Sequence, residues 1–329
     1  MVMSINTNMS NGLMCKIDNA DHDLFFSLVD YRNNLFTSDD PKKIIEFFNG
    51  FDNRNQLIQW MKERPKGISN IHEVEGDKDI IVVIPTADFE GKYARECRQN
   101  IFRGLHIIFV ESGRGGDFYF NYAHNCNVGI KKAMEYNPKW IVVSNDDMIK
   151  IDNSSKLREA LYNLRSEYPT IVFTSRSGKY HSRDVIISNR TLRRNFALYM
   201  KGNLERRKLK IEHFYKITYL IGSTHGMYPL FYKPQFIMKY FGSFSIFNYK
   251  VVELFNGNIF DESYINGTED IDLAWRIRQL SIVTEFIDFN IDDIIGGTLG
   301  SYNFTRRLRG LANDCYMNFK VEKGELKVL

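Results

Sequence analysis

The sequence predicts an α/β protein with a mainly parallel central sheet flanked by helices. Short, continuous apolar runs occur at residues 80–84, 105–110 and 140–143, and helical patterns follow the second and third runs. Uninterrupted apolar runs are typical of strands that are buried on both faces. Alternation of such strands with helices is typical of a parallel sheet.

The composition favours a folded protein with a large core. The chain has 329 residues, of which 43% are hydrophobic and 14% aromatic, and its net charge is +4. At roughly 150 residues per domain, this length fits about two domains or one large domain with additions. So small a net charge gives no reason to expect a dedicated nucleic-acid binder. The four scattered cysteines exclude a zinc ribbon and a disulfide-stapled scaffold, and they suit a reducing compartment.

Nothing in the sequence predicts insertion into a membrane or export. No stretch approaches the roughly 18 uncharged apolar residues that a membrane span needs. The N-terminal residues lack a basic segment followed by an apolar one, so we expect no secretory signal. We therefore expect a cytoplasmic protein, and peripheral contact with a membrane surface is an alternative.

Residues 1–78 are expected to form an N-terminal helical extension. Asp40 and Pro41 have the pattern of a helix start, and Gly50 ends that helix. A second helix is expected to bury four apolar side chains, those of Leu57, Ile58, Trp60 and Met61.

The main domain is expected to span residues 79–303. Its strands at 80–84, 105–110, 140–143 and 171–173 alternate with helical patterns at about 120–135 and 155–166. Residues 178–216 hold 11 Lys/Arg against 3 Asp/Glu and are expected to form a basic helical insertion. This insertion is either a solvated surface or a contact with an anionic membrane, while nucleic-acid binding ranks last. Residues 304–329 are expected to form a C-terminal basic tail.

Polar residues follow three of these strands, where α/β sheets bind their ligands. Thr86 ends the first strand and Glu111 the second, and Asn145-Asp146-Asp147 follows the third. Two adjacent carboxylates repel each other unless a cation lies between them, and Mg²⁺ prefers such oxygen ligands. A turn with a helix cap is the alternative reading of this segment.

A second acidic cluster begins a helix near residue 269. Thr268 is expected to cap this helix, and Glu269, Asp270 and Asp272 lie in its first turn. Acids in a first turn stabilise the helix dipole, which is the structural explanation. Three acids in four residues exceed what capping requires, and one of them could act as a general base.

The order of these motifs resembles the family 2 glycosyltransferases, which have the GT-A fold. The first motifs are Pro-Thr and Glu-Ser-Gly at two strand ends. Next come Ala-x-Asn-x-Asn-x-Gly-Ile-x-x-Ala at 123–133 and then Asn-Asp-Asp after the third strand. The last are Gly-x₅-Tyr-Lys at 226–233 and Phe-Asp-Glu followed by Glu-Asp-x-Asp-Leu-x-x-Arg at 260–276. Together they span about residues 79–300, roughly two thirds of the chain.

The resemblance implies a role for each matching residue. Asp270 would be the catalytic base, with Glu269 and Asp272 as supporting or alternative carboxylates. Asp147 would hold a divalent metal, Mn²⁺ or Mg²⁺, and Asp146 would touch either the metal or the ribose. The nucleotide site would be formed by Pro85, Thr86, Glu111, Asn127 and Asp146.

The implied reaction moves a sugar from a nucleotide-sugar donor to a hydroxyl on a glycan, a lipid-linked molecule or a protein, with inversion expected at the anomeric carbon. Two features depart from the family. Glu111 stands where Asp is usual, and residues 292–301 lack the metal-binding His, so that Asp292 or Asp293 could replace it. Arg306 and Arg307 could contact the diphosphate, or they could lie on a solvated helix face.

Two other functions remain open. A nucleotidyltransferase can share the α/β scaffold and the acidic metal site, although the segment after the first strand, 86–92, is poor in glycine. A non-catalytic GT-A-like domain that binds a sugar-nucleotide or glycan is the second alternative, which the missing His keeps open.

Overall fold

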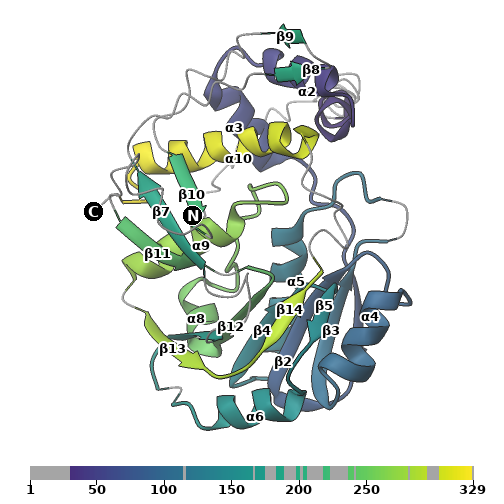
Figure 1. Cartoon of the computed structure of the whole chain (residues 1–329), viewed down its shortest axis with the longest axis vertical. Helices are drawn as coiled ribbons and strands as arrows, with labels where there is room; N and C mark the ends of the chain where they lie inside the picture. The colour runs from purple at the N-terminus through teal and green to yellow at the C-terminus, as the bar shows by residue number, and fades with distance from the viewer. Residues whose placement is uncertain are drawn as a thin grey trace, which may run out of the picture.

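The computed structural model describes residues 30–113, 116–165, 167–174, 183–188, 198–200, 203–205, 218–222, 236–240, 242–280, 282–294 and 304–327. Its centre is a seven-stranded sheet with the strand order β1-β3-β2-β4-β12-β6-β13 (Figure 1). The strands are β1 (Asn70–Val74), β2 (Asp77–Thr86), β3 (Leu105–Glu111), β4 (Trp140–Ser144), β6 (Thr170–Thr174), β12 (Phe244–Asn248) and β13 (Val283–Ile287).

The sheet is mostly parallel. Strands β3, β2, β4, β6 and β13 run in one direction, and β1 and β12 run in the other. Helices flank both faces, so the predicted mixed α/β architecture with a mainly parallel sheet is confirmed. The strand β12 was not predicted: it enters antiparallel between β4 and β6.

The continuous apolar runs form two cores because alternate side chains of a strand point to opposite faces. One face packs against α4 (Lys92–Glu96), the π-helical turn η1 (Cys97–Ile101) and α6 (Ser154–Tyr162). The other face packs against α5 (Tyr122–Met134), α8 (Tyr249–Leu254) and α9 (Glu269–Gln279). The sheet is therefore the middle layer of three.

A third core joins the first described helices of the chain to the last one. The helices α2 (Pro41–Asn49) and α3 (Arg54–Glu63) contact α10 (Phe304–Glu322), and their buried side chains share a cluster with Tyr264 and Trp275. Asp40 caps α2, Pro41 is its first residue and Gly50 follows its end, as the sequence predicts. The segment expected to be a basic tail contains this 19-residue helix, which buries one apolar face.

The N-terminal helices are fixed to the loop before α5 through a buried arginine. Arg64 is 3% exposed, and its guanidinium donates to Asn33 Oδ1 and to the carbonyl oxygens of Phe118 and Tyr119. The strand β1 lies inside the segment expected to be a helical extension and pairs with β3. The domain boundaries themselves stay a prediction.

The expected helical form of residues 178–216 is wrong for the described part of that segment. Its described residues are strands: β7 (Arg183–Ser188), β8 (Leu198–Met200) and β9 (Asn203–Glu205). Strand β7 is the middle strand of a small antiparallel sheet, between β10 (Thr218–Gly222) and β11 (Phe236–Tyr240). Charge content alone does not distinguish helix from strand, whereas the β-branched run Val185-Ile186-Ile187 favours a strand. The remaining residues of the segment lie outside the description.

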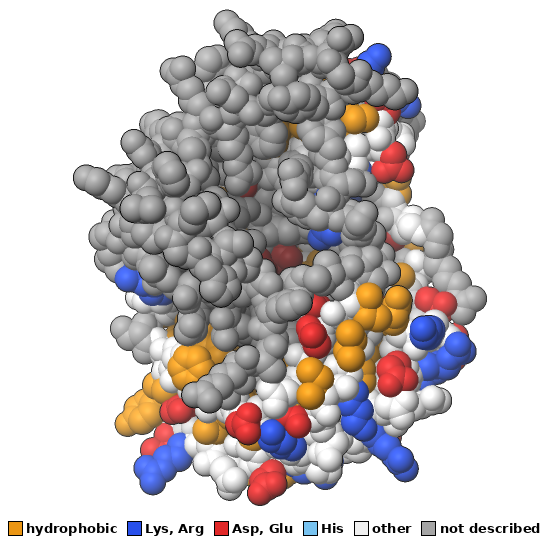
Figure 2. Space-filling view, in the orientation of Figure 1, with side chains coloured by type: hydrophobic (Ala, Val, Ile, Leu, Met, Phe, Trp, Pro, Cys, Tyr) orange, Lys and Arg blue, Asp and Glu red, His pale blue; other side chains and the backbone are white. Residues whose placement is uncertain are grey.

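Two short strands lie next to the carboxyl ends of the central sheet. Strand β5 (Met148–Lys150) pairs antiparallel with β14 (Ile291–Asp293). The face over these strands carries exposed apolar side chains beside acidic ones (Figure 2), and Ile149 and Ile294 are among the exposed residues. Among the helices that the structure describes, none combines the length and the apolar character required to span a membrane.

Candidate active site at the carboxyl end of the sheet

Thr86 and Asp146 connect the carboxyl ends of the neighbouring parallel strands β2 and β4. The Thr86 hydroxyl donates to Asp146 Oδ2 over 2.7 Å, and Thr86, Asp146 and Asp147 are all buried. Burial, and then the charges of Asp146 and Asp147, raise the pKa of the Cys97 thiol. The carboxylates of Asp146 and Asp147 therefore both lie within electrostatic reach of the Cys97 thiol. Pro85 precedes Thr86 as a buried residue of β2.

Glu111 lies at the end of β3, opposite Thr86 in the strand register. One carboxylate oxygen accepts from the backbone N–H of Phe89 at 3.0 Å, and the other lies 2.8 Å from His72 Nε2. The His72 ring stacks on Phe89 with 4.4 Å between ring centroids. Glu111 therefore fixes the loop after β2, and both of its oxygens already have partners within the protein.

Asn145 connects the end of β4 with the first residue of α5. The Tyr122 hydroxyl donates to Asn145 Oδ1 over 3.0 Å, and the Tyr122 backbone N–H donates to Asn266 Oδ1 over 3.0 Å. Asn266 lies in the loop that leads into α9. Two loops that are far apart in the sequence therefore meet at Tyr122.

The backbone that enters α9 is strained. Asn266 has a φ of 50° and Thr268 has a φ of 77°. A β-branched residue in the left-handed region is unusual, and such strain costs about 1–3 kcal/mol. Thr268 occupies the predicted N-cap position, but its side chain does not make the expected cap hydrogen bond. Strained turns of this kind occur often at functional sites.

Asp272 does not belong to the site. It is completely buried, and its carboxylate accepts hydrogen bonds from Arg276 Nε at 2.6 Å, Lys320 Nζ at 2.6 Å and the Tyr264 hydroxyl at 3.1 Å. Two cations compensate its charge on the face of α9 that packs against α10. An acid held in this way does not serve as a proton acceptor, so the structure assigns Asp272 a structural role.

Glu269 and Asp270 differ from Asp272 because no cation bonds to them among the described residues. Burial, followed by the charge of Glu269, raises the pKa of Asp270 well above its usual value. Burial also raises the pKa of Glu269, while backbone N–H groups and the charge of Arg306 oppose this change. Glu269 is 7% exposed, and its Oε2 atom has no hydrogen-bond partner within the described part of the chain.

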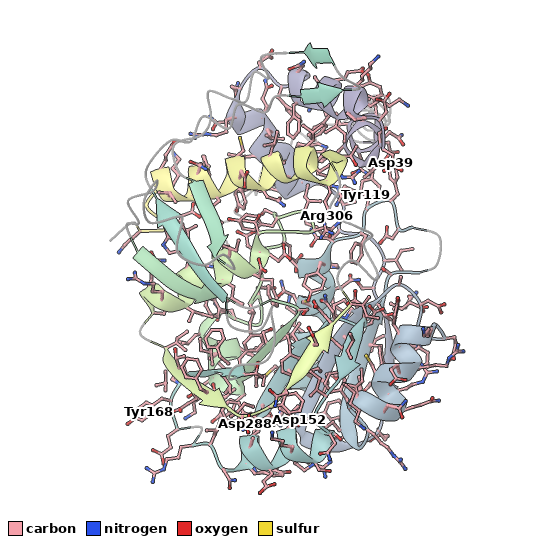
Figure 3. The ribbon with its side chains drawn as sticks, viewed as in Figure 1. Asp39, Tyr119, Asp152, Tyr168, Asp288 and Arg306 are labelled. Atoms are coloured by element: carbon pink, nitrogen blue, oxygen red, sulfur yellow. The ribbon has the colours of Figure 1, made fainter. Side chains whose placement is uncertain are left out.

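Arg306 comes to this cluster from the start of α10. Figure 3 shows it near the beginning of that helix, on the side towards the strand ends. Its positive charge opposes the rise in the pKa of Glu269 that burial causes. The structure thus brings a cation from the end of the chain to the acids of α9. The side chain of Arg307 lies outside the described residues.

Asn127 and Gly129 position the site without entering it. The Asn127 amide donates to the Phe260 carbonyl at 2.8 Å and to Glu262 Oε1 at 3.0 Å, and its oxygen accepts from the Phe260 N–H. Asn127 is fully buried, so its expected nucleotide contact becomes a positioning role. Gly129 lets α5 approach the sheet, since a Cβ there would lie 2.4 Å from Val83 Cγ1.

The pairing of β5 with β14 brings residues 292–294 next to the acidic motif. Asp293 lies opposite Met148, and the Ile294 N–H donates to the Asp147 carbonyl over 2.8 Å. The backbone of residues 292–294 therefore lies beside Asp147, where a residue that replaces the missing His would have to be. Residues 295–300 of this segment lie outside the description.

Asp146 and Asp147 are adjacent buried carboxylates, which are the ligand type that a divalent cation such as Mg²⁺ takes. Such an ion takes one or two carboxylates and completes its coordination with water and phosphate oxygens. No group of three or more His, Cys, Asp or Glu side chains suited to a metal occurs within the described ranges. A cation at Asp147 would therefore depend on phosphate oxygens of a ligand.

Sequence reasoning missed Tyr122 and the loop residue Asn266. Both flank motifs that were recognised: Tyr122 directly precedes Ala123, and Asn266 lies three residues before Glu269. Asn in a loop next to Gly267 is a signal for the left-handed backbone observed there. The hydrogen bond between Tyr122 and Asn145 has no local signal because it joins residues 23 positions apart.

Comparison of the chain with models of known protein families gave no match, and comparison with curated proteins gave no significant match either. The likeness to family 2 glycosyltransferases therefore depends on the residues and motifs of this sequence.

Proposed function

We propose that this protein is a glycosyltransferase of the GT-A type that uses a nucleotide-sugar donor. One observation carries the proposal. The acidic motif after β4 and the acidic start of α9, which are more than 100 residues apart, meet at the same end of the sheet through Tyr122. A transferase of this kind needs a donor side that holds a diphosphate and an acceptor side that holds a base.

The donor side would be formed at the ends of β2, β3 and β4. Asp147, together with Asp146, would hold a divalent cation that supplies positive charge to the diphosphate. Thr86 keeps Asp146 in place through its hydroxyl. Glu111 orders the loop that begins after Thr86, and this loop would border the nucleoside. Arg306 would add a second positive charge, since Arg suits bidentate contacts with oxyanions.

The acceptor side would be the start of α9. A general base works best when its pKa lies near the working pH, and burial moves Asp270 in that direction. The Asp270 carboxylate would accept the proton of the acceptor hydroxyl. The hydroxyl oxygen then bonds to the anomeric carbon, and the nucleoside diphosphate leaves with the electron pair of the broken bond.

The test is the release of nucleoside diphosphate from a panel of nucleotide-sugars with Mn²⁺ or Mg²⁺ and mixed hydroxyl acceptors. Wild-type protein should turn over one donor class. Asp270→Asn should abolish the transfer and should still bind the nucleotide. Full activity of Asp270→Asn would overturn the assignment of the base. Nucleotide binding without turnover of any donor would favour the non-catalytic alternative.

A further inference from the structure

Tyr122 lies between the two halves of the proposed site. Its hydroxyl donates to Asn145 Oδ1 over 3.0 Å, and its backbone N–H donates to the loop before α9. Its ring packs edge-to-face on Phe260, with 6.4 Å between centroids. The residue is therefore held by its backbone, its ring and its hydroxyl.

The direction of the hydroxyl bond decides how the Asn145 amide is oriented. An Asn side chain presents an acceptor oxygen at one corner and a donor NH₂ group at the other. Because Oδ1 accepts from Tyr122, the NH₂ group faces away from the tyrosine. Asn145 is partly exposed, and no acceptor for this NH₂ group occurs among the described residues.

The hydroxyl remains a proton donor at neutral pH. Burial raises the pKa of Tyr122 well above its usual value, and the nearby Cys126, Glu269 and Asp270 raise it further. The same charges show that the phenol lies within electrostatic reach of the acids of α9. A group that stays protonated between two acidic segments can hold one amide orientation throughout the reaction.

We propose that Tyr122 is a positioning residue that fixes the Asn145 amide with its NH₂ group towards the donor diphosphate. Asn145 would then donate a hydrogen bond to an anionic oxygen of the nucleotide and would not ligate a cation through Oδ1. This inference rests on the proposed function, because it assigns one contact within the donor side of that site.

The test is a double-mutant cycle on nucleotide binding without added metal. The probe is whichever of UDP, GDP, dTDP, CDP and ADP stabilises the wild-type protein most, and Kd is measured calorimetrically in EDTA. Tyr122→Phe and Asn145→Ala should each weaken binding by about 10-fold, and the double variant should be no weaker than Asn145→Ala alone. Such non-additivity is expected only if Tyr122 acts through Asn145.

Two further variants keep the test independent of folding. Tyr162→Phe is the matched control, since it removes an exposed hydroxyl that donates to Asp77 on the other side of the fold, and it should leave Kd unchanged. Asn145→Asp keeps the size of the side chain, and its charge should weaken metal-free binding more than Asn145→Ala does.

The outcomes separate this inference from the proposed function. Additive losses in the cycle, an unchanged Kd for Tyr122→Phe, or wild-type affinity of Asn145→Asp would overturn the role of Tyr122 and leave the transferase proposal standing. If wild-type protein binds none of the five nucleotides with or without Mn²⁺, both proposals fall.

Discussion

Lys320 Nζ lies 2.6 Å from Asp272 Oδ2 and 2.9 Å from Asp261 Oδ2, in a site where Lys320 and Asp272 are both buried. Helix α10 thereby compensates one acid of the cluster at the start of α9, while Glu269 and Asp270 remain on the other side with raised pKa values. Three acids within four residues therefore divide into one that contacts two cations and two that form no ion pair among the described residues.

Asp272→Asn is expected to lower the free energy of unfolding by about 3 kcal/mol, because it removes the buried negative charge that Arg276 and Lys320 both contact and leaves Lys320 with Asp261 as its remaining acidic partner. Urea denaturation of the variant and the wild type measures this difference. Asp270→Asn serves as the matched control, since its side chain makes no ion pair among the described residues, and it should not destabilise the protein at pH 7. An Asp272→Asn protein of wild-type stability would contradict the division of roles.

The raised pKa of Asp270 predicts a pH-dependent difference in stability. A folded-state pKa above the ordinary Asp value of 3.8 means that the folded protein holds this proton more tightly than the unfolded chain. This contribution is fully present below pH 3.8 and is lost as the pH rises through the raised folded pKa. The Asp270→Asn variant has no carboxyl group there and cannot lose stability in this way. Its free energy of unfolding should therefore rise relative to that of the wild type as the pH rises. Urea denaturation at several pH values above 3.8 checks this, and a constant difference would refute it.

Glu269→Gln should change the pH dependence of activity. The negative charge of Glu269 is the second cause of the raised pKa of Asp270, after burial. Its removal lowers the pKa of Asp270, so the base becomes deprotonated at lower pH. The acid limb of the kcat/KM profile for the active donor should therefore move to lower pH. An unmoved limb, or a move to higher pH, would show that Asp270 does not govern it.

Two helical glycines should respond in opposite ways to alanine. Gly129→Ala would place a Cβ 2.4 Å from Val83 Cγ1 and 2.9 Å from Val110 Cγ2, and such overpacking costs about 1–3 kcal/mol. Gly310→Ala in α10 meets no atom within 4 Å, so it should gain about 0.5–1 kcal/mol from helix propensity. Thermal unfolding of both variants tests the close packing of α5 on the sheet. Equal effects of the two changes would contradict it.

The sequence was sufficient for the elements whose apolar pattern is local. The runs that became β2, β3, β4 and β6 were predicted, as were α2, α3, α5, α6 and α9. The strand β12 was not, because its place between β4 and β6 depends on antiparallel pairing with residues about 70 to 100 positions away. Basic composition misled the prediction for residues 183–188, which form β7.

The acidic residues of the candidate site were predicted, but their environments were not. Asp272 looks equivalent to Asp270 in the sequence, and its contacts with Arg276 and with Lys320, which lies 48 residues away, distinguish the two acids. Asn127 was expected to meet a ligand, and its amide instead holds the loop at Phe260. Roles that depend on partners far along the chain require the structure.

The measurement that tests the central claim most directly is nucleotide-dependent thermal stabilisation. Wild-type, Asp147→Ala and Asp270→Asn proteins are compared with UDP, GDP, dTDP, CDP and ADP, each with and without Mn²⁺ or Mg²⁺. One nucleotide at about 100 times its Kd should stabilise wild type and Asp270→Asn by about 2.7 kcal/mol when metal is present. The same nucleotide should stabilise Asp147→Ala no more than it stabilises the wild type without metal. Wild-type protein that is stabilised by none of the five nucleotides, with or without metal, would contradict the proposal.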